Sequence, residues 1–139
     1  MLAEVGWNRR TSIAKNPTAL DPNVSRDAWG FRAVFEPAYY QVLPELDITV
    51  PIGVGYNPQG KSSVVAAFNG GVDRGGDVSI GVNGEYQKVW KLSAKYTHYL
   101  GSEDVFVIPS TSANSALMNS FDQTLKDRDF LSFSIQYTF

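Results

Sequence analysis

The chain contains no cysteine among its 139 residues, and it is poor in charge. The lack of cysteine excludes disulfide scaffolds, zinc knuckles and thiol nucleophiles. Charged residues make up 19% of the sequence, whereas a soluble domain averages about 25%. The formal net charge is −2, so no basic excess is present that would attract nucleic acid. We therefore expect no nucleic-acid partner.

Long apolar runs are also absent. No stretch approaches the roughly 18 consecutive apolar residues that indicate a transmembrane helix. Residues 1–7 lack the basic region and apolar core of a secretory signal peptide. Aromatic residues, in contrast, reach 13% of the chain. The length fits one domain, and the order of the residues has to decide its class.

Apolar and polar residues alternate over most of the sequence. Between residues 46 and 56 the even positions are apolar, and the odd positions are polar, glycine or proline. Such alternation predicts a β-strand with one apolar and one polar face. The same pattern predicts six strands, at about residues 2–10, 28–40, 46–56, 76–87, 90–100 and 128–139. Each is close to the length of about 9–11 residues with which a tilted strand crosses a bilayer.

The connections between these strands differ in length. Two are tight turns, around Val42–Glu45 and Gln87–Val89, and three are long, at about residues 11–27, 57–75 and 101–127. Outer-membrane barrels combine short periplasmic turns with long external loops in this way. The sequence thus predicts an all-β fold: an antiparallel up-and-down meander of six transmembrane-type strands. We interpret residues 1–139 as a single segment of a partial, C-terminal outer-membrane β-barrel.

The apolar faces of the predicted strands carry too many large side chains for the inside of a small barrel. A barrel of about eight strands has an interior only just wide enough for its own side chains. We therefore expect the apolar face to contact lipid and the polar face to line a lumen. Aromatic residues near the strand ends fit the interfacial girdles of membrane barrels. A soluble secreted β-sandwich with a conventional core is the alternative.

Charges of both signs lie on the polar face. The lumen-lining candidates are Arg32, Glu36, Asp47, Asp77, Glu85, Lys91, Lys95 and Arg128. The turn at Gln87–Val89 is expected to bring Glu85 close to Lys91, in a cross-strand pair worth about 0.2–1 kcal/mol. Two interpretations remain open: a pore lining, or charge balancing that only stabilises the sheet. Because both signs are present, no ion selectivity is predicted.

The C-terminal residues carry the most specific signal. The chain ends in Phe139, and Phe133, Ile135 and Tyr137 occupy alternate positions before it. This ending resembles the sorting signal of bacterial outer-membrane proteins, which implies recognition by the barrel-assembly machinery. Such an edge strand, apolar on one face, can pair with the open backbone of another strand. We expect the bacterial outer membrane as the location, and its lipid and the assembly machinery as partners.

Several segments resemble the proteobacterial family catalogued as domain of unknown function 1302. The resemblance rests on residues 20–30 (LDPNVSRDAWG), 35–41 (FEPAYYQ), 53–58, 67–71 and 125–133. It covers essentially the whole chain and matches the C-terminal end of the family's longer members. It implies an outer-membrane β-barrel, often encoded beside a periplasmic lipid-handling protein and an exporter-like membrane protein. It also suggests traffic of hydrophobic compounds, and it implies no catalytic residue.

One motif points to a nucleotide, but its surroundings do not. Residues 55–62 fit the P-loop pattern G-x-x-x-x-G-K-[ST]. A P-loop needs a helix directly after it and a strand before it that is apolar on both faces. Here the strand alternates, and the apolar residues after Ser62 amount to barely a turn or two. We interpret these residues as an external loop.

No arrangement of residues indicates catalysis or a metal site. His98 is the only histidine, and it lies on the apolar side of its predicted strand. No serine is spaced to form a hydrolytic pair with it. The acidic residues in or beside the loops lack a calcium-loop pattern; these are Asp73, Asp77, Glu103 and Asp104. We expect no enzyme activity, no metal and no cofactor.

The function predicted is part of a pore or transport channel for small molecules, hydrophobic ones included. The first alternative is a non-transport surface or structural barrel with a ligand or adhesion function in its loops. The second alternative is the soluble β-sandwich. Residues 112–121, in the last long loop, are predicted either as a short capped helix that folds over the pore or as an ordinary surface loop.

Overall fold

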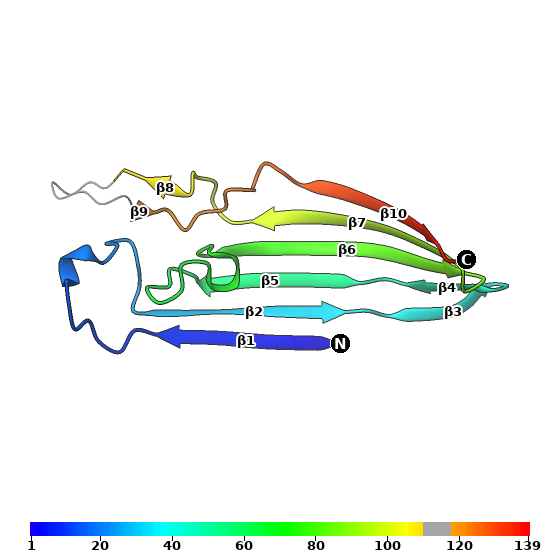
Figure 1. Ribbon diagram of the computed structural model, residues 1–139, viewed down its shortest axis with the longest axis horizontal. Coiled ribbons are helices and arrows are strands. Elements are labelled where there is room, and N and C mark those ends of the chain that lie inside the picture. The colour runs from blue at the N-terminus through cyan, green and yellow to red at the C-terminus, as the bar shows by residue number, and fades with distance from the viewer. Residues whose placement is uncertain (110–117) are drawn as a thin grey trace.

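The computed structural model describes residues 1–109 and 118–139, and it shows one extended antiparallel sheet (Figure 1). The strands of the sheet are β1 (Leu2–Arg9), β2 (Asp27–Phe35), β3 (Ala38–Leu43), β4 (Leu46–Thr49), β5 (Ile52–Gln59), β6 (Gly75–Tyr86), β7 (Trp90–Leu100) and β10 (Phe130–Tyr137). A separate antiparallel pair of short strands, β8 (Val107–Ile108) and β9 (Met118–Asn119), lies in the last long loop. The 3-10 turns are η1 (Pro17–Ala19) and η2 (Phe68–Gly70). Within the described ranges, no helix has the length and apolar character needed to cross a membrane.

Prolines divide two long strands into pairs of shorter ones. Pro37 separates β2 from β3, and Pro51 separates β4 from β5. A proline has no backbone N–H to donate to a neighbouring strand. Its carbonyl still accepts: Val50 donates to Pro37 at 3.0 Å, and Gly81 donates to Pro51 at 2.8 Å. Pairing therefore continues past each break, and the eight strands of the sheet amount to six long ones.

These six long strands form an up-and-down meander in which each is antiparallel to its neighbours. The predicted all-β antiparallel meander is confirmed. The three long loops lie together at one end, called the loop end, and the β3–β4 and β6–β7 turns lie at the other, called the turn end (Figure 1). In the described part of the chain β1 pairs only with β2 and β10 only with β7, so the sheet is open and is not a closed barrel.

The strand register places most apolar residues of the six long strands on one face of the sheet. Val5 lies opposite Phe31, and Phe31 lies opposite Tyr56. Toward the other edge of the sheet, and on the same face, Leu92 of β7 lies opposite Ile135 of β10. Directly opposite residues of paired strands share a face. We call this the apolar face and the other the polar face.

In the central strands, burial of the two faces is the reverse of that in a typical soluble sheet. Ser79 and Thr97, on the polar face, are 8% and 7% exposed. Ile80 and Val82, on the apolar face, are 51% and 49% exposed. Aliphatic side chains are normally the most buried residues of a folded protein. The central strands of this chain therefore bury polar groups and expose apolar ones.

Buried apolar side chains in the described residues lie at the loop end instead of under the sheet. They are Ala28, Val72 and Phe121. The backbone N–H of Asp73 donates to the carbonyl of Phe121 at 2.7 Å, which joins the β5–β6 loop to the β7–β10 loop. This small core holds the long loops against one another and against the ends of the strands.

Candidate functional site on the polar face

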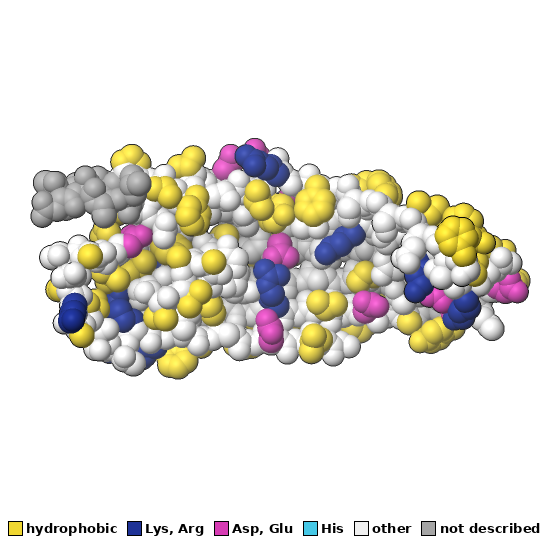
Figure 2. All heavy atoms as spheres, viewed as in Figure 1, with side chains coloured by type: hydrophobic (Ala, Val, Ile, Leu, Met, Phe, Trp, Pro, Cys, Tyr) yellow, Lys and Arg dark blue, Asp and Glu magenta, His cyan; other side chains and the backbone are white. Residues whose placement is uncertain are grey.

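A row of charged residues crosses the middle of the polar face. Glu4 lies opposite Arg32, Arg32 opposite Gly55, and Gly55 opposite Asp77. Figure 2 shows acidic and basic side chains on one face of the sheet. Arg32 Nη2 reaches Asp77 Oδ1 at 3.0 Å, although β5 lies between their strands. A Cβ at residue 55 would lie 3.0 Å from the guanidinium carbon, so glycine at this position lets Arg32 extend across β5.

Part of the β5–β6 loop lies on the same face, just beyond this row. The Asn57 side chain donates to the carbonyl oxygens of Asn69 at 3.1 Å and Val72 at 2.9 Å. The Asn69 side chain donates in return to Asn57 Oδ1 at 2.6 Å. Asn69 Oδ1 also accepts a hydrogen bond from Arg32 Nε at 2.6 Å. The sequence predicted residues 57–75 as an external loop, whereas the asparagine pair draws this part of it onto the polar face.

A second group of charges lies at the turn end. Lys88 Nζ lies 3.3 Å from Asp47 Oδ2 and 3.3 Å from Glu85 Oε1. Lys91 Nζ lies 3.6 Å from Glu85 Oε2, which is the cross-strand pair that the short turn predicted. Hydrogen bonds to Glu85 and then to Asp47 raise the pKa of Lys88 above its usual value. The Gln41 N–H donates to Asp47 Oδ1 at 2.9 Å, so one carboxylate joins both turns.

A polar groove of about 480 Å³ lies beside this group. It is lined by Tyr40, Asp47, Thr49, Asn83, Gly84, Glu85, Lys88, Lys91, Leu92, Ser93, Ser134 and Gln136. The lining offers hydroxyl, amide, carboxylate and ammonium groups, and it carries both signs of charge. Such a lining can be wetted and can hydrogen-bond a polar solute, and it has no single sign of charge that would select an ion.

The other lumen-lining candidates lie apart from these two groups. Lys95 is on the polar face of β7, opposite Gly81, and Glu36 lies in the link between β2 and β3. Arg128 is not on a strand: it precedes β10, and its Nε lies 3.4 Å from the carboxylate of the adjacent Asp127. The chain pairs with β7 only from Phe130 onward, so the expected strand start at residue 128 comes two residues too early.

The residues of the predicted assembly signal extend from the edge of the sheet. Phe133 and Ile135 are 73% and 67% exposed on the apolar face of β10. The Tyr137 ring lies 4.6 Å from the Trp90 ring and 5.2 Å from the Phe139 ring, between ring centroids. An aromatic cluster therefore lies at the turn end of the apolar face, beside an edge with unpaired backbone groups.

The family model described as "Protein of unknown function (DUF1302)" matches residues 1–139. The chain belongs to this family. Comparison with curated proteins and with solved structures found no match. Membership of DUF1302 agrees with the resemblance found in the sequence, and the family description names no function.

At the start of β10 the DUF1302 chain contains a cluster that the sequence did not predict. Asp129 precedes β10, and its Oδ2 accepts hydrogen bonds from the Tyr96 hydroxyl at 2.7 Å and from His98 Nδ1 at 2.6 Å. The Tyr99 N–H donates to the other carboxylate oxygen at 3.2 Å. These bonds, that of His98 first, lower the pKa of Asp129 to about 2. The carboxylate fastens the start of β10 to β7, and no motif connected residues so distant in the sequence.

The residues that fit the P-loop pattern do not form a P-loop in this DUF1302 chain. Residues 55–59 are part of the extended strand β5. Lys61 Nζ donates to Asn23 Oδ1 at 2.9 Å, and Ser62 Oγ donates to Asn8 Oδ1 at 2.8 Å. These side chains bind neighbouring segments of the loop end. The described residues also include no group of three or more His, Cys, Asp or Glu side chains able to hold a metal.

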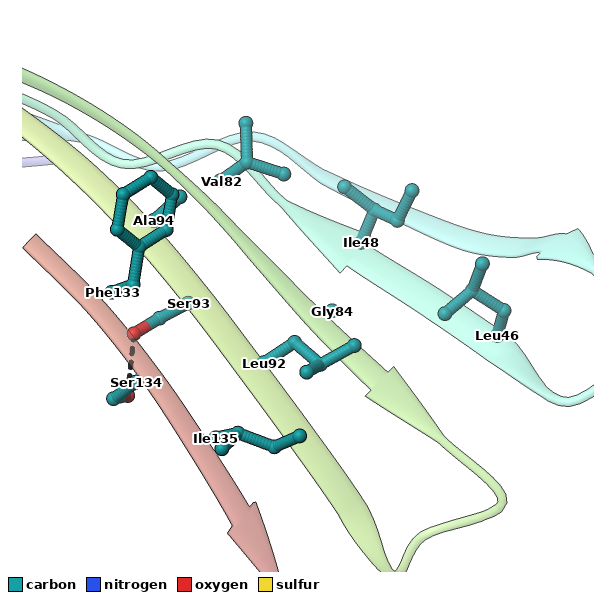
Figure 3. Close-up of a pocket in the computed structure, with 10 residues that line it drawn as sticks. All are labelled: Leu46, Ile48, Val82, Gly84, Leu92, Ser93, Ala94, Phe133, Ser134 and Ile135. Carbon is teal, nitrogen blue, oxygen red and sulfur yellow. Dashed lines mark hydrogen bonds between the residues drawn. The ribbon is translucent and has the colours of Figure 1, made fainter.

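The apolar face of the DUF1302 sheet has a groove of its own at the turn end. It encloses about 520 Å³ and lies between β4, β6, β7 and β10. Figure 3 shows Gly84 in the middle of it, with the aliphatic side chains of Leu46, Leu92 and Ile135 around it. The missing side chain at residue 84 creates the hollow, and its walls are almost entirely hydrocarbon.

Proposed function

We propose that this chain forms part of the wall of a β-barrel in a bacterial outer membrane. Its polar face would line a passage for small molecules, hydrophobic ones included. The observation that carries the proposal is the reversed burial of the faces, with Ile80 and Val82 far more exposed than Ser79 and Thr97. In water an apolar surface of this extent would promote association. Against lipid it is favourable, and a polar inner face suits a wet lumen.

The surface proposed to contact lipid spans the whole sheet. Apolar-face residues more than a third exposed are Val5, Trp7, Trp29, Phe35, Tyr39, Ile52, Val78, Ile80, Val82, Tyr86, Trp90, Leu92, Tyr96, Leu131, Phe133, Ile135 and Tyr137. The apolar groove beside Gly84 offers room for a lipid acyl chain (Figure 3). Many of these residues are aromatic, as in the girdles of membrane barrels.

The open edges of the sheet are part of the proposal. β1 and β10 each have one strand neighbour in the described sheet, so each presents unpaired backbone groups. A backbone group left unpaired in hydrocarbon costs several kcal/mol, and only closed barrels avoid this with strands. Single-chain bacterial barrels have at least about eight strands. We therefore propose that further strands complete the barrel on both edges.

The orientation of the faces can be tested with single cysteines, because the chain has none of its own. Ile80→Cys and Lys95→Cys place one thiol on each face. In liposomes, a fluorophore on residue 80 is expected to be quenched by spin-labelled lipid, and residue 95 to react with a water-soluble thiol reagent. Absence of quenching at residue 80 would contradict a lipid-facing sheet and favour a soluble β-sandwich.

The transport role is tested by conductance of the reconstituted protein in planar bilayers. We expect stepwise conductance increases as single molecules insert, since a polar wall with mixed charges holds water and ions. The cysteine labels show independently whether the protein has inserted. Insertion without conductance would contradict a passage and favour a surface or structural barrel with its function in the loops.

We further propose that the barrel-assembly machinery binds β10 through the edge that ends in Phe139. Phe139→Ala is expected to slow assembly, because it removes an exposed ring from the aromatic cluster with Tyr137. Thr138→Ala, one residue earlier, is the matched control. Assembly is measured by the heat-dependent gel mobility of folded barrels. Equal assembly of both variants would contradict the proposal.

A periplasmic lipid-handling protein and an exporter-like membrane protein are proposed as further partners, on the resemblance to the family alone. A photo-crosslinker in place of Lys88 would capture such partners, because this side chain lies in the β6–β7 turn and is 78% exposed. A crosslinker in place of Lys61, at the loop end, is the control. Capture of these proteins from residue 61 and not from residue 88 would contradict an orientation in which the turn end faces the periplasm.

A further inference from the structure

The β5–β6 loop does not simply extend beyond the sheet; part of it lies on the polar face. We propose that its segment Phe68–Val72 is a fixed constriction that limits the size of solutes in the passage. This inference rests on the proposed function, because a constriction requires a lumen. This segment, and not the polar face as a whole, would set the size limit.

The segment is fixed by a pair of asparagine side chains. Asn57 is completely buried, and its amide group makes hydrogen bonds to Asn69 and Val72 on the loop. Asn69 Nδ2 donates to Asn57 Oδ1 at 2.6 Å and also contacts the carbonyl of Phe31 at 3.4 Å. Buried amides are expected to have partners of this kind. All of these partners are lost together if the segment leaves the face.

Glycines in the strands provide the room that the segment occupies. A Cβ at Gly6 would lie 3.2 Å from two carbons of the Phe68 ring. A Cβ at Gly30 would lie 2.0 Å from Asn57 Oδ1, where no side chain fits. The two glycines are opposite each other on β1 and β2. The strands therefore lack side chains at the positions that the loop and its partner asparagine fill.

The segment Phe68–Val72 is held in its middle and just after its C-terminal end. Asn69 and Gly71 have φ values of 44° and 73°, in the left-handed region, and these reverse the direction of the chain over the sheet. At the base of the loop, the Gly60 N–H donates to Asp73 Oδ1 at 2.8 Å. In the middle, Asn69 Oδ1 is bound by Arg32, whose other contact is Asp77. The loop and the charged row thus form one connected unit.

The position of this unit gives it its proposed effect. Phe68 adds an aromatic ring to the polar face, and the ring lines a small cavity of about 160 Å³ together with Glu4, Gly6 and Arg32. The free cross-section of a barrel is set by its strand number less whatever lies on the inner wall. A loop layer at this level therefore narrows the passage more than any single side chain does.

The test compares the conductance of reconstituted wild type with that of Asn69→Ala and Phe68→Ala. Both variants are expected to raise single-channel conductance about twofold, as more of the cross-section opens, and to admit larger sugars in liposome swelling. The matched control is Val65→Ala, because this side chain lies in the same loop and is 49% exposed. It is expected to leave both properties unchanged.

Proteolysis reports independently whether the segment has left the face. Chymotrypsin, with cleavage sites mapped by mass spectrometry, is expected to spare the bond after Phe68 in wild type and to cut it in Asn69→Ala. If that variant stays protected, Asn57→Ala combined with Asn69→Ala removes both amides. Conductance unchanged in a variant that chymotrypsin cuts would overturn the constriction alone. No conductance from any inserted form would overturn the proposed passage and the constriction with it.

Discussion

Two glycines of the sheet, one on each face, have different structural roles. Gly55 makes room for Arg32 to reach Asp77 on the polar face, and its Cβ would lie 3.0 Å from the guanidinium group. Gly84 opens a hollow on the apolar face, where a Cβ would meet only Leu46 Cδ1 at an ordinary 3.7 Å. Glycine costs a strand about 0.5–1 kcal/mol relative to alanine, through chain entropy. The two positions therefore differ in whether that cost is offset by a contact.

Substitution of these two glycines by alanine is expected to have unequal effects. Gly84→Ala should stabilise the protein by about 0.5–1 kcal/mol, because the entropy gain meets no clash. Gly55→Ala should be less stable than Gly84→Ala by about 1 kcal/mol, since it displaces a partly exposed ion pair. Denaturant unfolding of both variants in lipid vesicles measures the difference. Equal stabilities would contradict the role given to Gly55.

Asp129 is expected to make stability depend on pH in an acidic range. Its pKa is lowered to about 2 by His98, Tyr96 and Tyr99, whereas an unfolded aspartate has a pKa of about 3.9. A lowered pKa in the fold stabilises the fold above the unfolded pKa. This stabilisation should be complete above about pH 4 and lost as the pH falls toward about 2.

Two aspartates near the start of β10 provide the comparison. Asp129→Asn should lower stability at pH 5 and remove this part of the loss between pH 4 and 2. Asp127→Asn should keep it, because Asp127 only pairs with the neighbouring Arg128 at 3.4 Å. The readout is the denaturant midpoint of each variant at several pH values. If stability fell equally between pH 4 and 2 in wild type and in Asp129→Asn, the hydrogen bonds of Asp129 would not be the source of the pH dependence.

For single residues, the sequence predicted a contact across a short turn and missed contacts that are formed through long loops. Alternation and a short turn were enough to place Glu85 opposite Lys91. The Asn57–Asn69 pair and the His98–Asp129 contact depend on where long loops return to the sheet. Loop length gives no such position, because the entropy of closing a loop changes only slowly with its length.

The β6–β7 turn shows strain at the scale of an element. Gln87 and Lys88 have φ values of 54° and 61°, the pair of positive angles that a type I′ hairpin turn requires. Residues other than glycine pay about 1–2 kcal/mol for such a conformation. Lys88 offsets this with its contacts to Asp47 and Glu85. Gln87 has only its backbone hydrogen bond to Glu45, which any residue could make.

Gln87→Gly is therefore expected to raise the free energy of unfolding by about 0.5–1 kcal/mol, the left-handed penalty less the entropy of glycine. Gln59→Gly is the matched control, because Gln59 ends the extended strand β5. There the same change should lower stability by about 0.5–1 kcal/mol. Thermal or denaturant unfolding of both variants in lipid vesicles compares them. If both glycine variants were less stable than wild type, Gln87 would not be strained in the turn.

Strands were easier to predict than the breaks within them. Alternation continues across Pro37 and Pro51, so the sequence predicted one strand where the structure has two. In the last long loop, only part of the segment expected to be a short helix can be compared with the structure. Of the expected short helix at residues 112–121, residues 112–117 lie outside the described residues, and Met118–Asn119 form β9. The end of that segment is extended because it pairs with β8.

At the scale of the whole molecule, the face that a side chain occupies decides its environment. The alternating pattern predicted both faces, because strand geometry alone places alternate residues on opposite sides. It could not by itself tell a buried apolar face from an exposed one. The exposed fractions supply that distinction: Ile80 is 51% exposed on the apolar face, and Val34 is 41% exposed on the polar face. These two aliphatic residues are matched in type and exposure and differ in the face they occupy.

Arginine at these two positions separates a lipid-facing sheet from one exposed to water. Ile80 lies near the middle of β6, so Ile80→Arg should lower stability in lipid vesicles by about 2–4 kcal/mol, the cost of arginine near the bilayer midplane. Val34→Arg should have little effect, because its charge would remain in the wet lumen beside Gly53. Denaturant unfolding in the same vesicles compares the two variants with wild type. If both faces were in water, two residues of similar exposure should tolerate arginine equally, and equal stabilities would refute a lipid-facing sheet.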